Sequence, residues 1–332
     1  MSTAPDTRTP LACLYHWEKT CPQTVHLTQP IGGGQVIEYT WAQIMDQVRR
    51  MATHLQSLAL PPRSQIALLA KNTAHWMMAD WAIWMAGHVT VPLYPTLNAD
   101  TVRYILEHSD SRLLFVGKLD GWDMMKPGVP AGMPQIALPM APAGAGESWE
   151  EIVARSAPLQ GEPDRGLDEM ATIIYTSGST GQPKGVMQSF GSFNIAGTLM
   201  HDVIPARADD RMLSYLPLAH VAERLVTQNN STYHGFHVFF AESLETFVSD
   251  LRRARPTIFF SVPRLWTKFQ LGVSAKLPPE KQKLLFRIPF VGRKVKRKIL
   301  EQLGLQDVRI AITGAAPLPA PSIAWYRSLG LE

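Results

Sequence analysis

The 332-residue sequence contains very little cysteine, with only 2 residues, Cys13 and Cys21. Their spacing matches no common zinc site, and so few cysteines exclude a small scaffold held together by disulfides. We expect both to be small core residues of a protein that occupies a reducing compartment.

Long hydrophobic runs are also missing. The most apolar stretch, residues 76–97, is interrupted by aspartate, glycine, histidine and proline, which predicts no membrane-spanning helix. The polar N-terminal residues 1–10 lack the apolar centre of a signal peptide. These features predict a cytoplasmic protein.

Charge is sparse, with 18% charged and 45% hydrophobic residues, as in ordinary soluble domains. The length corresponds to about two units with cores of their own. The net charge of +4 comes from one window, residues 276–298, which holds nine Lys or Arg and one Glu. The remaining 23 basic and 27 acidic residues sum to −4, so we expect no nucleic-acid partner.

Short β-branched or apolar runs alternate with longer amphipathic segments, which predicts an α/β fold with parallel sheets. The predicted strands are 65–70, 89–93, 113–116, 171–175, 212–216, 237–240, 257–261 and 308–313. The predicted helices are 41–58, 73–86, 100–109, 192–203, 244–254 and 293–303. Thr40 and Asn98 are expected to cap the first and third of these helices. Residues 126–147 hold five Pro and four Gly, which indicates a long surface connection within one lobe.

The most informative segment is a predicted strand that runs into a loop of small and hydroxylated residues. The loop residues are Thr176, Ser177, Gly178, Ser179, Thr180 and Gly181, followed by Gln182, Pro183, Lys184 and Gly185. Glycines let backbone N–H groups approach an anion, hydroxyls add donors, and Lys184 adds positive charge, so the pattern predicts a phosphate cradle. The spacing matches neither the standard P-loop nor the dinucleotide fingerprint. The alternative is a flexible surface loop.

The segment 175–185 resembles the signature loop of the adenylate-forming (AMP-binding) enzymes, a superfamily that includes acyl-CoA synthetases. Members activate a carboxylate with ATP, release pyrophosphate and pass the acyl group to a thiol. The resemblance implies that residues 177–184 close over the β- and γ-phosphates of ATP, with Lys184 as a catalytic group. It also implies that Thr176 helps to hold Mg2+.

Two later segments resemble the same superfamily in the same order. Residues 213–224, which contain His220 and end in Glu223-Arg224, resemble the segment where a histidine meets the acyl carboxylate, in the variant of long-chain fatty acyl-CoA synthetases. Shorter fragments, including Asn72, look like that subgroup too. A turn after the last predicted strand resembles the one that packs against adenine, which implies nucleotide binding by Gly314, Ala315, Ala316 and Pro317.

The resemblance implies a fold of two stacked αβα layers with mostly parallel sheets. Residues 61–195 would form the first layer with the phosphate loop, and 196–332 the second layer with the adenine turn, joined by the N-terminal segment 1–60. The family's β-barrel and C-terminal lid domain are expected to be absent or incomplete, since the sequence stops directly after a helix and carries none of the family's downstream motifs. We therefore expect an N-terminal portion that is inactive by itself.

The implied activity is an AMP-forming acid–thiol ligase that uses ATP, Mg2+ and coenzyme A to activate a long-chain fatty acid. Two alternatives stay open. One is an adenylating ligase for another carboxylate, such as an aryl or amino acid. The other is a nucleotide- or lipid-binding module without catalysis.

His220 has a chemical reason to be catalytic that does not depend on the resemblance. Attack of a carboxylate on an α-phosphate brings two anions together, and a nearby hydrogen-bond donor reduces their repulsion. By residue type alone, a histidine at this place is equally compatible with a capped loop.

Other histidines and tryptophans have simpler interpretations. His234 and His237 could be a pair of metal ligands, but no cysteine or carboxylate cluster joins them, so we expect a turn that enters a strand. Trp76, Trp81 and Trp84 recur at helical spacing, which predicts core packing.

Residues 284–298 join an apolar stretch to the basic cluster Arg293–Lys298. Apolar residues beside cations can bind an anionic bilayer surface peripherally, which would help to collect long acyl substrates. Attraction for the phosphates of coenzyme A is a second interpretation. A solvated helix face is the third.

Overall fold

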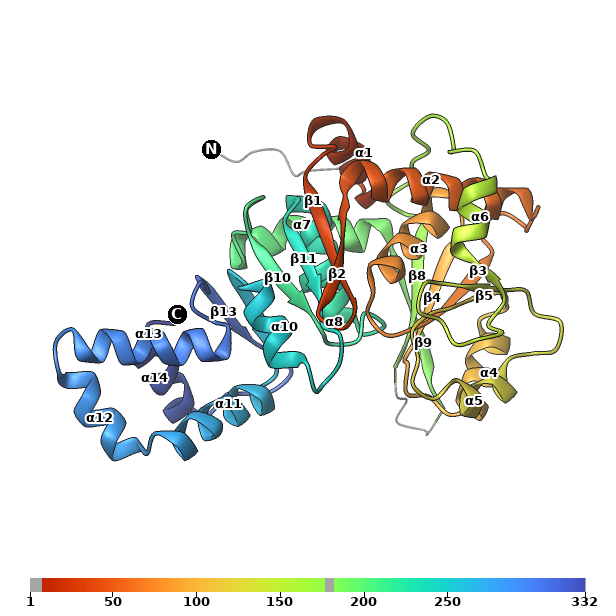
Figure 1. Ribbon diagram of the computed structural model, residues 1–332. Helices are drawn as coiled ribbons and strands as arrows, with labels where there is room; N and C mark the ends of the chain where they lie inside the picture. The colour runs from red at the N-terminus through yellow and green to blue at the C-terminus, as the bar shows by residue number, and fades with distance from the viewer. Residues whose placement is uncertain (1–7, 177–181, 332) are drawn as a thin grey trace. The chain divides into compact units, whose positions relative to one another are not determined.

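The computed structural model describes residues 8–176 and 182–331. The chain divides into two compact units, whose helices and strands are labelled in Figure 1. Unit 1 contains the described residues of Met1–Gln29, Ile37–Pro205 and Tyr215–Gly235. Unit 2 contains the described residues of Pro30–Val36, Ala206–Ser214 and Phe236–Glu332.

Unit 1 is built on a mostly parallel sheet flanked by helices. Its strands are β3 (Gln65–Leu69), β4 (Val89–Leu93), β5 (Ser111–Val116), β6 (Gln135–Ala137), β7 (Glu147–Ser148), β8 (Met170–Thr176) and β9 (Lys184–Ser189). Its helices are α1 (Pro10–Thr20), α2 (Trp41–Ser57), α3 (Ala74–Met85), α4 (Ala99–His108), α5 (Trp122–Met125), η1 (Lys126–Gly128), α6 (Trp149–Arg155), α7 (Phe190–Val203), α8 (Val221–Glu223), the π-helix η2 (Arg224–Asn229) and α9 (Asn230–His234). The hairpin of β1 (Val25–Gly32) and β2 (Gln35–Thr40) contains the boundary between the units.

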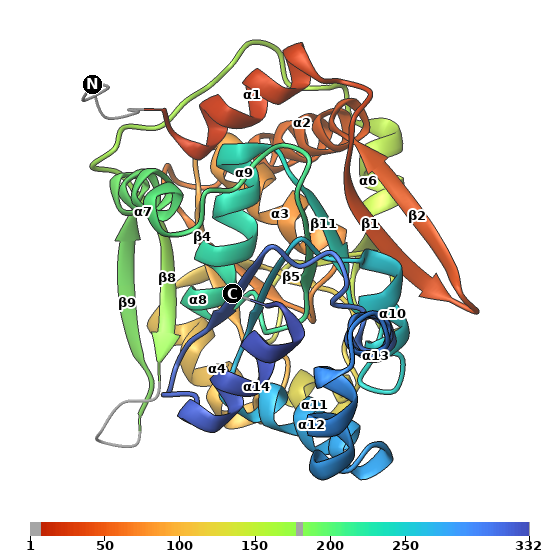
Figure 2. The same ribbon diagram turned by 90° about the vertical axis from the view of Figure 1, so that its left-hand side faces the viewer.

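The seven strands lie in the order β7-β6-β5-β3-β4-β8-β9. Every neighbouring pair is parallel except β8 and β9, which are antiparallel. Figure 2 shows β8 and β9 side by side at the edge of this sheet. The mixed α/β fold with mostly parallel sheets is the one that the sequence predicts.

Side-chain caps explain where α2 and α4 begin. Thr40 accepts a hydrogen bond from the Gln43 N–H at 3.3 Å, and the Gln43 side chain accepts one from the Thr40 N–H at 2.9 Å. This capping box starts α2, and Asn98 starts α4 by accepting from the Thr101 N–H at 2.9 Å. Both predicted caps are confirmed.

Helix α3 is buried along its whole length, because all twelve of its residues are buried. Trp76, Trp81 and Trp84 are 0%, 0% and 2% exposed, which confirms their predicted place in the core. A helix that is apolar all round belongs inside a protein, and α2 packs directly on it. Cys13 is buried and Cys21 is half-buried.

The Pro- and Gly-rich segment 126–147 differs from its prediction as a surface connection. It lies within one unit as expected, but β6 pairs with β5 in parallel inside it. Ile136, Leu138 and Ala145 are 3%, 2% and 1% exposed. Their burial outweighs the turn-forming tendency of the surrounding prolines and glycines.

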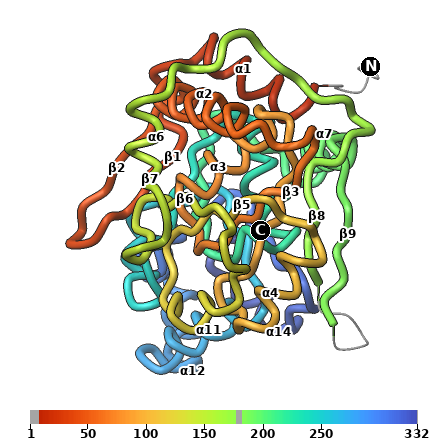
Figure 3. Tube along the Cα trace, turned by 90° about the vertical axis from the view of Figure 1, so that its right-hand side faces the viewer, coloured from red at the N-terminus to blue at the C-terminus, as the bar shows by residue number. Residues whose placement is uncertain are grey.

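The expected grouping of residues 1–60 with 196–332 stays a prediction. Most of the N-terminal segment clusters with residues 37–205, because α2 packs against α3 and α6. Figure 3 shows α2 and α6 together beside the sheet of unit 1.

Unit 2 contains two short parallel strand pairs and a set of helices. Its elements are β10 (Arg211–Ser214), β11 (His237–Phe240), α10 (Phe247–Ala254), β12 (Ile258–Ser261), α11 (Pro263–Lys276), α12 (Pro279–Arg287), α13 (Val291–Leu303), β13 (Ile310–Thr313) and α14 (Ala320–Leu329). β10 pairs with β11, and β12 pairs with β13. The sequence predicted neither α11 nor α12, and it predicted α14 only as a helix that directly precedes the end of the sequence. The first turns of all three helices contain proline. Proline breaks a helix interior but is favourable in a first turn.

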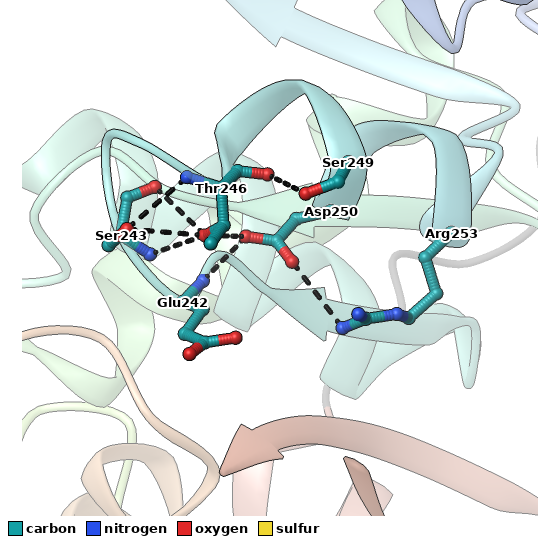
Figure 4. A network of polar contacts seen from close by, with 6 residues as sticks. All are labelled: Glu242, Ser243, Thr246, Ser249, Asp250 and Arg253. Atoms are coloured by element: carbon teal, nitrogen blue, oxygen red, sulfur yellow. Dashed lines mark hydrogen bonds and ion pairs between the residues drawn. The ribbon is translucent and has the colours of Figure 1, made fainter. Parts of the chain in front are cut away.

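Two buried aspartates organise this unit. Asp250 is 2% exposed and accepts bonds from the Glu242 N–H at 2.8 Å and the Thr246 hydroxyl at 2.7 Å, which ties the start of α10 to the preceding loop (Figure 4). Asp210 is 2% exposed and accepts from the Thr257 hydroxyl at 2.6 Å and from Arg309 Nε at 2.9 Å. Asp210 therefore joins the starts of β10, β12 and β13.

Asp210 should make stability depend on pH. Burial raises the pKa of its carboxyl, but bonds from Arg309, Thr257 and the Arg207 N–H lower it more, so the net pKa lies below the ordinary value. A lowered pKa stabilises the fold above about pH 4 and loses that contribution as pH falls further. We expect Asp210→Asn to lower the free energy of unfolding at pH 7 by about 1–3 kcal/mol and to weaken its acid dependence.

Denaturant titrations at several pH values measure both effects. Asp123→Asn, on an exposed position of α5, is the matched control and should change neither quantity. If Asp210→Asn unfolds at the same denaturant concentrations as the wild type at every pH, the hydrogen bonds of Asp210 do not stabilise the fold.

Candidate functional site

The hairpin of β8 and β9 presents the two described ends of the predicted phosphate loop. Thr176 is the register partner of Lys184, so one hydroxyl and one ammonium group are carried by opposed positions of the hairpin. Both residues are exposed, whereas Ile174 and Tyr175 are only 4% exposed and anchor β8 in the unit. The predicted cradle residues between them, Ser177, Gly178, Ser179, Thr180 and Gly181, lie outside the described residues.

Gly185 shows why the hairpin needs a glycine at the base of the loop. A Cβ at this position would lie 2.8 Å from Ile173 Cγ2 and 3.3 Å from the Tyr175 ring. The Tyr175 hydroxyl lies 2.7 Å from His108 Nδ1, which fixes the tyrosine ring. Burial raises the pKa of the Tyr175 phenol. The base of the loop is therefore tightly packed while its two ends are open to solvent.

His220 lies at the start of a helix and is exposed. Its Nδ1 accepts a hydrogen bond from the Ala222 N–H at 3.1 Å. Because an accepting Nδ1 carries no proton, the neutral ring has its proton on Nε2. His220 can therefore donate a hydrogen bond from Nε2 while Nδ1 serves as a helix cap. The two interpretations of this histidine, donor and cap, are compatible.

Asn72 holds the loop in front of His220. Its Nδ2 donates to the Leu216 carbonyl at 2.6 Å, and its Oδ1 accepts from the Leu218 N–H at 2.9 Å. This two-point contact fixes the loop against the connection between β3 and α3. The ring of Tyr94 lies edge-on to His220 with centroids 6.4 Å apart.

The predicted adenine turn follows β13 in unit 2. Gly314 donates its N–H to the Ser261 carbonyl at 3.3 Å, and a Cβ on it would lie 3.0 Å from the Phe260 ring. Ala315 has a left-handed backbone with φ of 68°, and Ala315, Ala316 and Pro317 are exposed. The residues thus form the strand-to-loop turn that the sequence predicts, and the structure shows it exposed; its binding of adenine stays a prediction.

A cavity of about 170 Å3 lies beside this turn within unit 2. Thr313 and Leu318 line it on either side of the turn, and Trp266 and Tyr326 contribute from α11 and α14. The Tyr326 hydroxyl donates to the Trp266 carbonyl at 2.6 Å, so the two helices are tied together at the cavity wall. Tyr326 was not among the predicted site residues, because its place at the cavity wall depends on the packing of α14 on α11.

Magnesium fits the described site only together with a nucleotide. Mg2+ keeps several waters and is usually bound by one or two carboxylates and by substrate phosphates, and in phosphate loops a Ser or Thr hydroxyl is one of its oxygen ligands. The exposed hydroxyl of Thr176 is such an oxygen. Within residues 8–176 and 182–331, no group of three or more His, Cys, Asp or Glu side chains could hold a metal ion alone.

His234 and His237 have the structural roles that the sequence predicts. His234 ends α9 before Gly235, whose φ is 74°, and His237 lies in β11. The ring of His234 stacks on that of His201, with Nε2 3.2 Å from Nδ1 of His201. Burial, with a contribution from Arg211, lowers the pKa of His237 to about 4.

Comparison with known proteins decides the family. The sequence profile of the AMP-binding enzymes matches residues 14–332. The chain belongs to this family. The long-chain-fatty-acid–CoA ligase FadD15 of Mycobacterium tuberculosis is 28% identical over 361 residues, covering 96% of this chain and 58% of that protein. The peroxisomal long chain acyl-CoA synthetase 6 of Arabidopsis thaliana is 31% identical over 294 residues, covering 78% of this chain and 41% of that protein.

Solved structures of the family share the fold. The anthranilate CoA ligase AuaEII in complex with anthranoyl-AMP matches with a TM-score of 0.79 at 17% identity, over 98% of this chain and 58% of that one. A benzoate CoA ligase from Burkholderia xenovorans LB400 matches with a TM-score of 0.75 at 19% identity, over 98% and 60%. The chain therefore spans only 58% of the length of FadD15 and 41% of the length of synthetase 6.

Proposed function

We propose that the protein takes part in the ATP-dependent activation of a long-chain fatty acid to an acyl-adenylate and in transfer of the acyl group to coenzyme A. The observation that carries the proposal is the pairing of exposed Thr176 and Lys184 at the two ends of the glycine- and hydroxyl-rich loop. The acyl-chain preference is supported by the names of the relatives FadD15 and synthetase 6.

In this proposal the chain's own residues bind and orient the reacting anions. Lys184 supplies positive charge to the β- and γ-phosphates, and Thr176 supplies a hydroxyl to Mg2+, which when bound neutralises phosphate charge. His220 donates from Nε2 to the substrate carboxylate without giving up its proton. A carboxylate oxygen attacks the α-phosphorus while the bond to pyrophosphate breaks, and the thiol sulfur later displaces AMP from the acyl carbon.

A second candidate is the same chemistry on an aryl acid. The structural neighbours include proteins whose titles describe anthranilate and benzoate CoA ligases. Pyrophosphate exchange by the full-length gene product with palmitate, benzoate and anthranilate separates the two candidates. We expect palmitate to give the fastest exchange. Exchange with none of the acids would instead favour a binding module without catalysis.

Lys184→Ala should weaken acyl-adenylate formation by about 30- to 1000-fold, because a charge-assisted contact to phosphate is lost. Pyrophosphate exchange by the full-length gene product measures this. Lys126→Ala, which removes another exposed lysine, is the control and should exchange at the wild-type rate. Exchange by Lys184→Ala within about twofold of wild type would remove Lys184 from the mechanism.

His220→Ala should slow formation of the acyl-adenylate more than thioester formation from acyl-adenylate supplied ready-made, because the donor acts on the incoming carboxylate. Separate assays of the two half-reactions test this, with His201→Ala as an exposed histidine control. Equal losses in both half-reactions would indicate a structural role for His220.

We also propose that the protein is cytoplasmic and touches anionic membranes peripherally through the hairpin of α12 and α13. No helix among the described residues is long and apolar enough to cross a membrane. Near the turn of the hairpin, Leu284 and Phe290 are 65% and 78% exposed, and Val291 is 42% exposed. The basic cluster Arg293–Lys298 begins directly after this turn, and each cation near an anionic surface contributes about 1 kcal/mol.

Binding to anionic phospholipid vesicles should therefore weaken with salt, since charges are screened over about 10 Å at 0.1 M. Lys294→Glu/Lys296→Glu/Lys298→Glu should abolish binding, and Leu284→Ser/Phe290→Ser should weaken it. Leu244→Ser, at a 90% exposed leucine elsewhere, is the control. Salt-independent binding or no binding would indicate that α13 is only a solvated helix face. Displacement of the vesicles by free coenzyme A would indicate that the basic cluster binds the phosphates of coenzyme A.

A further inference from the structure

A fully buried ion pair lies behind the His220 helix. Arg224 Nη2 donates to Asp80 Oδ1 at 2.5 Å, and both side chains are 0% exposed. Arg224 Cζ lies 5.5 Å from the ring centroid of Trp76, 5.4 Å from that of Trp84 and 5.3 Å from that of Phe193, so three aromatic rings contact the charged group.

This pair connects three separate elements of unit 1. Asp80 belongs to α3, and Arg224 begins η2. Arg224 Nη1 also donates to the Thr172 hydroxyl in β8 at 2.7 Å, and that hydroxyl donates to the Thr90 carbonyl in β4 at 2.7 Å. Gln228, one turn further along η2, donates to the second carboxylate oxygen of Asp80 at 2.7 Å.

The same arginine is bonded to His220 through the backbone. The Arg224 N–H donates to the His220 carbonyl at 3.1 Å. With the Asn72 contact on the preceding loop, His220 is held from both sides. Arg224 thus joins the histidine to Thr172, which lies four residues before Thr176 on the same face of β8.

Stability alone is a weak reason for such an arrangement. The free-energy cost of desolvating two buried charges cancels most of their Coulomb attraction. Apolar residues of the same volume often stabilise a fold as well as a buried ion pair does, or better. An apolar replacement cannot reproduce the directional hydrogen bonds of arginine, because a planar guanidinium fixes the angle of each hydrogen bond that it donates. The arrangement also occurs in a π-helix, a form that is frequent at functional sites.

We propose that Arg224, held by Asp80 and Thr172, is a positioning residue that sets the place of His220 relative to strand β8. The consequence for catalysis rests on the proposed function. The positioning itself is a property of the described chain and can be measured without any substrate.

The sharpest probe is the hydroxyl of Thr172. Thr172→Val keeps the shape and β-branching of the side chain but removes the acceptor for Arg224, and Thr172→Ser restores the hydroxyl. Thr257→Val is the matched control, because it removes a hydroxyl that donates to Asp210 at 2.6 Å in unit 2.

Hydrogen exchange of the purified 332-residue chain gives the substrate-free readout. In Thr172→Val, the amides of Ala222 and Arg224 should exchange about tenfold faster, with amides of β3 and β5 unchanged. Thr172→Ser should return the two amides to near wild-type rates, and Thr257→Val should leave them unchanged. Faster exchange throughout unit 1, or unchanged exchange at Ala222 and Arg224, would overturn the proposal and leave the pair a stabilising contact.

Asp80→Leu/Arg224→Met provides an independent test. This double variant removes both charges together, so no unpaired charge stays buried. Gln228 loses its acceptor, so the chain should still fold but with a moderately lower melting temperature. We expect Ala222 to exchange faster all the same, because no group fixes the direction of the helix. Wild-type exchange at Ala222 in a folded double variant would contradict the proposal.

The full-length gene product adds the catalytic readout. Thr172→Val should lower kcat for pyrophosphate exchange by about tenfold and change the KM for ATP little, a split that a general loss of folded protein would not produce. No exchange by the wild type would refute the proposed function while the amide result still stands. If Thr172→Val speeds up hydrogen exchange of the Ala222 and Arg224 amides but leaves kcat at the wild-type value, then the positioning of His220 by Arg224 does not contribute to catalysis.

Discussion

Complete burial of α3 is the constraint on which the rest of unit 1 depends. Its twelve residues are all buried, and one of them is the acid Asp80. A buried carboxylate needs a cationic partner, which here is Arg224 at the start of η2. The helix that begins at His220 is therefore anchored to α3 by charge, while Trp84 of α3 donates to the Ala171 carbonyl of β8 at 2.9 Å. One buried helix thus contacts both parts of the candidate site in unit 1.

The strand pairing around β8 has a second consequence. β8 is parallel to β4 on one side and antiparallel to β9 on the other. A tight hairpin is possible only between antiparallel strands, and among the described strands of the seven-stranded sheet only the neighbours β8 and β9 are antiparallel. The strand pairing places Thr176 directly opposite Lys184. Gly185 fits the packed base of the hairpin because it has no Cβ that would clash there.

In unit 2, two buried carboxylates hold neighbouring elements together by hydrogen bonds. Asp210 joins the starts of three strands, and Asp250 joins α10 to its preceding loop. The exposed turn at Gly314–Pro317 is carried by β13, which this network holds in place. The hairpin of α12 and α13, by contrast, presents exposed apolar and basic side chains, and it is the part of the chain to which we attribute a partner other than the substrates.

Local sequence features predicted the α/β class, most strands, the caps at Thr40 and Asn98 and the burial of the three tryptophans, because each depends on local periodicity or local hydrogen bonds. Residue type, spacing and a family resemblance also predicted the phosphate loop, the turn after β13 and His220 as candidate site elements. Tertiary structure decided that β9 lies antiparallel to β8 and that β6 is buried within a Pro- and Gly-rich segment. Only the fold could pair Asp80 with Arg224 across 144 positions, since burial creates the need for that partner and sequence spacing carries no trace of it.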